Sequence, residues 1–210
     1  MRLPGGARLT IAAAPLANAI AAEWQAAGGA KGGEMSFADT PLTRLAGTAQ
    51  ERIAGNRDAN IAVLAGYAET DLLCYRAEAP LPLIQRQARE WQPWLDWAAL
   101  TYDAPLKVTS GIVHVAQDAV VLRALRAAVA RQNILVLAGL GIVVPLLGSL
   151  VLGLAVVEAG LDAAAAHRLG CLDEHFQEEF WGTDTEALKR RDAVAADLAV
   201  ATRFIGLARQ

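Results

Sequence analysis

The chain has 210 residues, of which 54% are hydrophobic and 20% charged, and its formal net charge is −3. This length can bury a sizeable core without disulfides, and two cysteines outside any CxxC pair favour a reducing compartment, expected to be the cytoplasm. No cleavable signal pattern opens the sequence, which agrees with that expectation. Nucleic acid is not expected as a partner, because proteins that bind it usually carry a basic domain or stripe.

Residues 1–34 are predicted to form a small α+β part. Pro4, Gly5 and Gly6 indicate a turn, and residues 7–11 can continue as a short strand. A helix is predicted from Pro15 to Gly28, because Leu16, Ile20 and Trp24 recur at the spacing of one helical face. The glycine-rich residues 27–33 then predict a linker. The expected fold class is therefore α+β, with a small strand-containing N-terminal part followed by a larger, mainly α-helical domain at residues 35–210.

The larger domain is predicted to consist mostly of amphipathic helices. Apolar residues keep a period near 3.6 from Leu42 to Ala65 and again from Leu83 to Ala98. Short extended segments are expected on both sides of Ser110. Further helices are predicted at residues 118–132, at 161–180, ending at Gly182, and from a capping box at 183–186 to about residue 207.

Residues 132–157 contain no charged side chain. This uncharged run is long enough to form a membrane-spanning helix. Glycines and Pro145 interrupt the run, and no Trp/Tyr belt marks its ends. We therefore predict two buried helices joined near residues 145–149 and no membrane span. A membrane-associated helical protein anchored by this run is the alternative.

No catalytic motif or cofactor site is predicted. The sequence lacks a nucleophile elbow and a phosphate-binding loop, and His114 is expected to be a core residue. His167, Cys171 and His175 lie at i, i+4 and i+8, so a metal site is one interpretation of this cluster. On one continuous helix these residues span about 12 Å, too far for both rings to hold one ion. A helical metal-binding protein is kept only as a second alternative.

Residues 173–181 combine acidic and aromatic side chains on one predicted helix. The acidic residues are Asp173, Glu174, Glu178 and Glu179; Phe176, Phe180 and Trp181 flank them, and Gln177 lies among them. Such a segment is either a binding face or a solvated outer face whose aromatic rings lie in the core. The position of each carboxylate within one helix is compatible with both interpretations.

The string DEHFQEEFWG at residues 173–182 resembles the most characteristic motif of the F-type ATP synthase assembly chaperones that bind the α subunit. Five further blocks resemble their family counterparts in the same order and extend the resemblance over nearly the whole chain. They lie at residues 21–24, 41–46, 71–76, 87–97 and 148–152.

The resemblance implies a small N-terminal α+β part, a larger helical part and no enzymatic activity. It also implies that the protein binds newly made α subunit, shields the surface that later meets the β subunit, and releases it during assembly of the catalytic head. Such a protein is expected to be monomeric when free, in the bacterial cytoplasm or, for eukaryotic relatives, in the mitochondrial matrix. The expected partner-binding residues are Glu174, Glu178, Gln177, Asp173, Trp181 and Trp24.

The chain departs from the family pattern in two places. The family usually begins with a longer strand-rich segment ahead of Pro4, and residues 137–147 are more apolar here than is usual for the family. Trp24, Asp71, Tyr75 and Arg76 match family blocks, yet each also has a plausible folding role, such as that of a buried aromatic or of a partner in an internal ion pair.

Overall fold

The computed structural model describes residues 2–28, 39–182 and 184–210 of the chain. Helices dominate the described residues, and two short strands pair in parallel through Tyr75 with Thr109 and Arg76 with Ser110. The predicted α+β class, dominated by helices, is confirmed. The helices are α1 (Ala14–Ala27), α2 (Pro41–Thr48), α3 (Arg57–Gly66), α4 (Leu81–Tyr102), α5 (Ala119–Ala130), α6 (Ile134–Leu147), α7 (Leu150–Glu158), α8 (Ala163–Gly170), α9 (Leu172–Trp181) and α10 (Thr185–Ala208), and the strands are β1 (Tyr75–Arg76) and β2 (Thr109–Ser110).

Shorter helical turns connect α2, α3 and β1. A π-helical turn (Ala49–Ile53) and a 3-10 turn (Ala54–Asn56) lie between α2 and α3, and two 3-10 turns (Tyr67–Thr70 and Leu72–Cys74) lead to β1. At the N-terminus the predicted turn forms, but the predicted strand at residues 7–11 is reduced to one antiparallel bridge between Arg2 and Arg8. The predicted boundary between residues 34 and 35 lies outside the described residues, so the two-domain division stays a prediction.

The apolar run forms two buried helices, α6 and α7, as predicted. Gly148 ends α6 with a positive φ of 61°, and the Ser149 hydroxyl accepts a hydrogen bond from the Leu152 amide at 3.0 Å to cap α7. No helix in the described ranges combines the length and apolar character needed to cross a bilayer. Helix α6 lies at the centre of the molecule. It packs against several other helices, namely α2, α3, α7, α8 and α10.

Three local predictions were wrong. The helix expected at 161–180 is two helices, because the backbone breaks at Cys171 (φ −105°, ψ 22°) between α8 and α9. The capping box predicted at residues 183–186 does not cap α10. Asp184 is the N-cap instead, and its carboxylate accepts hydrogen bonds from the Glu186 and Ala187 amides. Thr183 itself lies outside the described residues. His114 is an exposed loop residue rather than a core residue, with Nδ1 3.1 Å from the Tyr75 hydroxyl.

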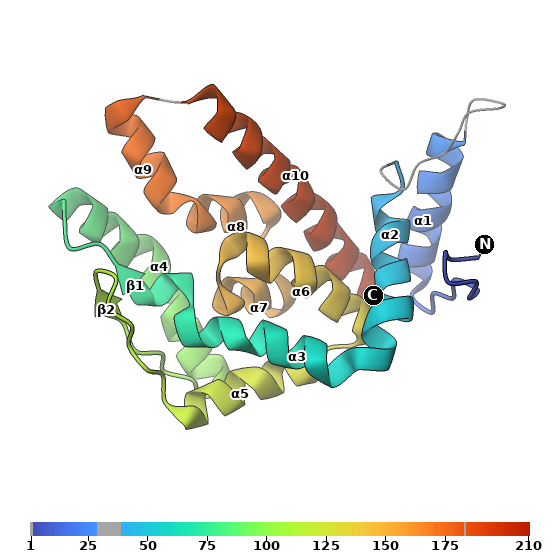
Figure 1. Ribbon diagram of the computed structural model, residues 1–210, viewed down its shortest axis with the longest axis horizontal. Coiled ribbons are helices and arrows are strands. Elements are labelled where there is room, and N and C mark those ends of the chain that lie inside the picture. Colours follow the sequence, from blue (N-terminus) through green and yellow to red (C-terminus); the bar gives the residue numbers. More distant parts are fainter. Residues whose placement is uncertain (1, 29–38, 183) are drawn as a thin grey trace.

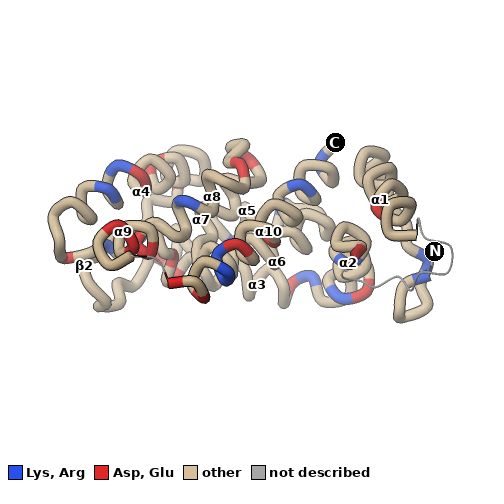
Figure 2. Tube along the Cα trace, turned by 90° about the horizontal axis from the view of Figure 1, so that it is seen from above, with Lys and Arg blue, Asp and Glu red and all other residues tan. Residues whose placement is uncertain are grey.

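The helices are arranged so that the two ends of the molecule are built from different parts of the chain. Figure 1 shows α9 and the first turns of α10 at one end, and α1 and α2 at the other. Seen from above, α9 and β2 again lie at the end opposite α1, and acidic residues gather on α9 (Figure 2). The acidic and aromatic segment singled out in the sequence therefore lies at one end of the molecule.

Candidate functional site

The candidate site is the outer face of α9. This helix begins at Leu172, directly after the helical backbone is interrupted at Cys171. Phe176 anchors the helix: its ring is buried, and the Arg86 guanidinium of α4 lies 5.1 Å from the ring centroid. A cation over an aromatic face is attracted by the ring quadrupole, so this contact helps to hold α9 on α4. The site therefore rests on a packed helix pair.

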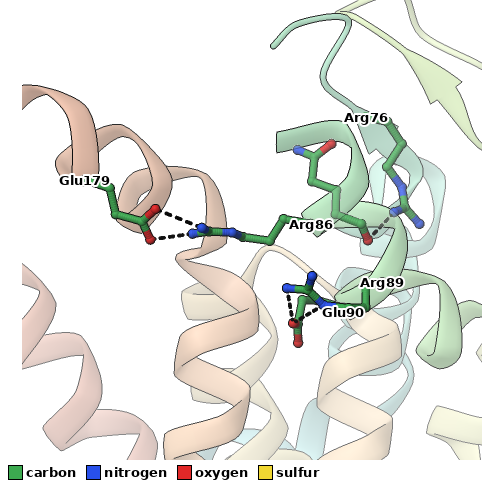
Figure 3. Close-up of polar contacts among 6 residues, drawn as sticks. Arg76, Arg86, Arg89, Glu90 and Glu179 are labelled. Carbon is green, nitrogen blue, oxygen red and sulfur yellow. Dashed lines mark hydrogen bonds and ion pairs between the residues drawn. The ribbon is translucent and has the colours of Figure 1, made fainter. Parts of the chain in front are cut away.

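Three carboxylates of α9 are used to fix the helix to its neighbours. Arg86 donates two hydrogen bonds to Glu179, of 2.6 and 2.8 Å (Figure 3), which holds the pKa of Glu179 below its ordinary value. The Gln87 amide donates to Asp173 at 2.7 Å. On the α10 side, Arg191 forms an ion pair with Glu178 at 2.5 Å, and its own side chain is only 8% exposed.

A different set of α9 side chains is left facing solvent. Glu174 and Gln177 are exposed and form no hydrogen bond or ion pair with any residue that the structure describes. Phe180 is 65% exposed although its ring lies 4.9 Å from that of Phe176, and Trp181 is 87% exposed. Two neighbouring exposed aromatic rings beside free polar groups are typical of an interaction surface.

Three of these exposed side chains, Glu174, Gln177 and Trp181, border a shallow hollow between α9 and α10. Glu174, Gln177, Glu178 and Trp181 follow the i, i+3, i+4, i+7 spacing of one helical face. Asp184, Ala187 and Arg190 complete the lining on the α10 side, and the hollow has a volume of about 350 Å³. We call this surface, defined by Glu174, Gln177, Phe180 and Trp181, the α9 face.

Both interpretations of the acidic segment apply, each to different residues. Phe176 lies in the core, as a purely structural helix requires, whereas Phe180 and Trp181 do not. Glu179 is exposed, as expected of a solvated outer face, but it is paired with Arg86 rather than free. Asp173 and Glu178, both expected to bind the partner, have partners within the chain. Their predicted contact with another protein stays a prediction.

Trp24 does not join the α9 face. It lies on α1, at the opposite end of the molecule (Figure 1), and its indole Nε1–H donates to the Thr43 hydroxyl at 2.8 Å. The neighbouring Glu23 accepts from the Leu42 and Thr43 amides and so caps α2. These contacts fit a folding role for residues 23 and 24, and the predicted part of Trp24 in partner binding stays a prediction.

Gln87 connects helix α9 to a buried polar group behind it. Arg76 donates to the Gln87 carbonyl at 2.6 Å (Figure 3), and the Gln87 side chain both accepts from the Ala77 amide and donates to Asp173. Because Gln87 is fully buried, these contacts fix its orientation. The Gln87 side chain therefore links the Ala77 backbone to Asp173 of α9.

Asp71 has a folding role, which it fills by accepting backbone hydrogen bonds rather than through the ion pair expected from the sequence. Its carboxylate is fully buried and accepts from the Leu73 amide at 3.1 Å and the Val151 amide at 3.0 Å, which joins the turn before β1 to the start of α7. Burial raises the pKa of Asp71 to about 6, although the hydrogen bonds from Val151, Ser149 and Leu73 oppose that shift.

The His167, Cys171 and His175 cluster is closer together than expected. The two imidazole centroids are 6.1 Å apart and the Cys171 thiol lies 3.7 Å from His167 Nε2. The expected span of about 12 Å assumed one continuous helix, and the break at Cys171 removes that assumption. Burial, with the nearby His175 ring, lowers the pKa of His167. Within the described part of the chain, no group of three or more His, Cys, Asp or Glu side chains is arranged to hold a metal ion.

Sequence reasoning missed the residues that hold α9 in place, namely Arg86, Gln87 and Arg191. Arg86 and Gln87 gave no local signal, because their partners lie 93 and 86 positions away. Arg191 did have a local sequence signal, because it falls on the same helical stripe as Val194, Leu198 and Ala201. A lone arginine among apolar residues indicates a buried ion pair.

The fold and the α9 face together define a mostly helical protein with an exposed acidic and aromatic helix. Residues 1–99 match the family model described as ATP12 chaperone protein. The structure of Atp12 from Paracoccus denitrificans is similar over 100% of this chain and 88% of its own, with 44% identity and a TM-score of 0.94. A candidate chaperone from Agrobacterium tumefaciens is 31% identical, with a TM-score of 0.90 over 98% of this chain and 75% of its own.

At this identity and coverage the chain belongs to the ATP12 family of ATP synthase assembly chaperones, as the sequence motifs indicated. This is a family of chaperones and not of enzymes.

Proposed function

We propose that this chaperone binds newly made α subunit of the F-type ATP synthase through the α9 face. It covers the surface of the α subunit that later meets the β subunit and releases it as the catalytic head assembles. The proposal depends on one observation about α9: Asp173, Glu178 and Glu179 are paired within the chain, whereas Glu174 and Gln177 are exposed and have no partner among the described residues.

The exposed side chains suit a protein partner rather than a small molecule. Trp181 offers a large apolar surface that a partner can bury, and Glu174 beside it can pair with a cationic or amide group of that partner. Fixing α9 in advance through Arg86 and Arg191 lowers the entropy that must be lost on binding. Asp173 and Glu178 contribute to this proposal mainly by positioning α9.

Covering an unassembled subunit is physically useful. A subunit destined for a large interface exposes apolar surface before its partner arrives and is prone to aggregate. A chaperone bound to that surface lowers the concentration of the free, aggregating form by mass action. The proposal takes the protein to be a monomer when free and to act in the bacterial cytoplasm, with the mitochondrial matrix as the corresponding place for eukaryotic relatives.

A binding experiment with purified subunits tests the proposal. The chain is mixed at micromolar concentration with isolated α subunit and, in a parallel sample, with isolated β subunit, and complexes are separated by size-exclusion chromatography. We expect a complex with α only, and less light scattering from α subunit when the chaperone is present. Absence of any α complex at this concentration would contradict the proposal.

A further inference from the structure

A second surface, separate from the α9 face, lies along α6. Helix α6 has no charged residue, and most of it is buried, yet Gly141 and Pro145 are exposed one turn apart. The surface stripe of a helix in a soluble protein normally carries polar side chains. Here the exposed stripe of α6 is apolar. Apolar residues that stay exposed do not contribute to the core, so the need to fold does not explain why this stripe is apolar.

The stripe forms the floor of a groove with a volume of about 420 Å³. Its walls come from α2, the π-helical turn, α3 and α10, and Val63 on the α3 side is 67% exposed. The apolar lining includes Leu45, Ile53, Leu64, Leu137, Ile142 and Val200. An open apolar groove between helices is the shape that receives an amphipathic helix of another protein.

The charges at the rim define what such a helix must carry. Arg44 and Arg52 lie on one side of the groove, and Asp197 of α10 lies on the other. Both arginines are exposed, and neither forms an ion pair with a residue in the described part of the chain. Two unpaired arginines against one aspartate complement a segment with acidic side chains beside its apolar face.

The groove is placed where a protein bound to the α9 face can reach it. Helix α10 borders both surfaces, through Ala187 and Arg190 at the hollow beside α9 and through Asp197 and Val200 at the groove. Arg190 and Val200 are ten residues apart, which is about 15 Å along a helix. Arg190 and Asp197 are seven apart and therefore point to nearly the same side of α10.

We infer that the α6 groove binds an amphipathic α-helix of the client, whose apolar face lies on Gly141 and Ile142 and whose acidic side chains pair with Arg44 and Arg52. The inference rests on the proposed function only in taking the α subunit as the client. The groove is a second contact surface, distinct from the α9 face.

Gly141 allows the groove to be blocked without disturbing the fold. A Cβ atom added at Gly141 meets no atom within 4 Å, so Gly141→Leu places a side chain in the groove. Leucine also has a higher helix propensity than glycine, so the variant is expected to fold. Gly206→Leu on α10 is the matched control, because Gly206 is also helical and exposed and has the same open surroundings outside the groove.

The first arm of the test uses synthetic peptides and does not depend on the client. One peptide of about five helical turns carries leucines on one face and glutamates on the other; its twin carries lysines in place of the glutamates. We expect the glutamate peptide to bind wild type at least about tenfold more tightly than the lysine peptide. Binding of the glutamate peptide should be weakened about tenfold by Gly141→Leu, and also by the double variant Arg44→Glu, Arg52→Glu. Gly206→Leu should leave this binding unchanged.

Equal binding of the two peptides, or a Gly141→Leu variant that binds like wild type, would overturn the inference. A wild-type dimer that dissociates in Gly141→Leu, seen by analytical ultracentrifugation, would also overturn it, because the occupant would then be a second copy.

The second arm repeats the titration with purified α subunit. Weaker binding by Gly141→Leu than by Gly206→Leu supports the client assignment, and equal binding overturns it. If wild type fails to bind α subunit at all, the proposed function is lost, while the peptide arm still decides whether the groove takes an acidic amphipathic helix.

Discussion

Arg86 on α4 and Glu179 on α9 form a two-point contact, with Nη1 and Nη2 of the guanidinium 2.6 and 2.8 Å from the two carboxylate oxygens. The residues are 93 positions apart in the chain, so this pair fixes how α9 lies on α4. Because the Glu179 side chain is half exposed, the pair is expected to act on the position of α9 more than on global stability.

Arg86→Ala should therefore loosen α9 while leaving the thermal unfolding temperature nearly unchanged. Hydrogen–deuterium exchange of the α9 amides is expected to become several times faster, because local opening becomes easier. Arg89→Ala is the control, since Arg89 pairs with its neighbour Glu90 on the same helix and joins no two elements. Equal exchange of α9 in both variants would show that the Arg86 contact does not hold the helix.

The pair of Arg191 and Glu178 should matter more for stability. The Arg191 side chain is 8% exposed and that of Glu178 21%, so removing the cation leaves a largely buried carboxylate without its partner. We expect Arg191→Ala to lower the free energy of unfolding by about 1–3 kcal/mol. Arg190→Ala, one residue earlier and exposed, should change it by less than about 0.5 kcal/mol. Urea denaturation measures both, and equal effects would contradict this account.

Asp71 should make stability depend on pH. Because its folded pKa is raised to about 6 from 3.8, the folded state binds the proton more tightly than the unfolded state between these values. The contribution of Asp71 to the unfolding free energy therefore falls as pH rises through this window and grows as pH falls. From pH 7 to pH 5 the gain should be about 1 kcal/mol.

Asp71→Asn removes this titration and keeps a side chain of similar shape. It should be less stable than wild type at pH 7, because an NH2 group, which cannot accept, replaces one of the two carboxylate oxygens, so only one of the hydrogen bonds from Leu73 and Val151 is kept. The stability difference between wild type and variant should widen from pH 7 to pH 5. Parallel pH profiles of the two proteins would contradict the raised pKa.

Two glycines of α6 should respond in opposite ways to the same substitution. A Cβ atom at Gly139 would collide with Ile205 of α10, whereas one at Gly141 meets nothing. Gly139→Ala should therefore destabilise the protein by about 1–3 kcal/mol, because two closely packed helices must separate. Gly141→Ala should be neutral or stabilising by up to about 1 kcal/mol. Thermal melts of the two variants that do not differ would contradict the close approach of α6 and α10.

Sequence reasoning worked where the signal was local. The junction of α6 and α7 was predicted because glycines and Pro145 interrupt the apolar run, and in the structure Gly148 ends α6 and Ser149 caps α7. The break at Cys171 was missed, although Gly170 beside it is a possible helix-end signal. In the structure a Cβ atom on Gly170 would press against Leu147, so packing as well as turn geometry favours glycine there.

The candidate site was only partly predictable for a physical reason. Helical periodicity indicates which residues share a face, and in the structure Glu174, Gln177 and Trp181 line one hollow beside α9. It does not indicate which of several carboxylates finds a cation on another helix, because that depends on how distant segments pack. The distinction between Glu178 and Glu179, which are paired, and Glu174, which has no partner among the residues that the structure describes, therefore required the structure.

The most direct test of the central claim is the affinity for purified α subunit of wild type, Glu174→Lys and the control Glu69→Lys, whose glutamate is also exposed but lies on a 3-10 turn outside α9. Glu174→Lys should weaken binding by about tenfold or more with an unchanged unfolding temperature, because it reverses a free charge on the α9 face. Glu69→Lys should bind like wild type. Equal affinities for all three proteins would contradict the claim that the α9 face binds the α subunit.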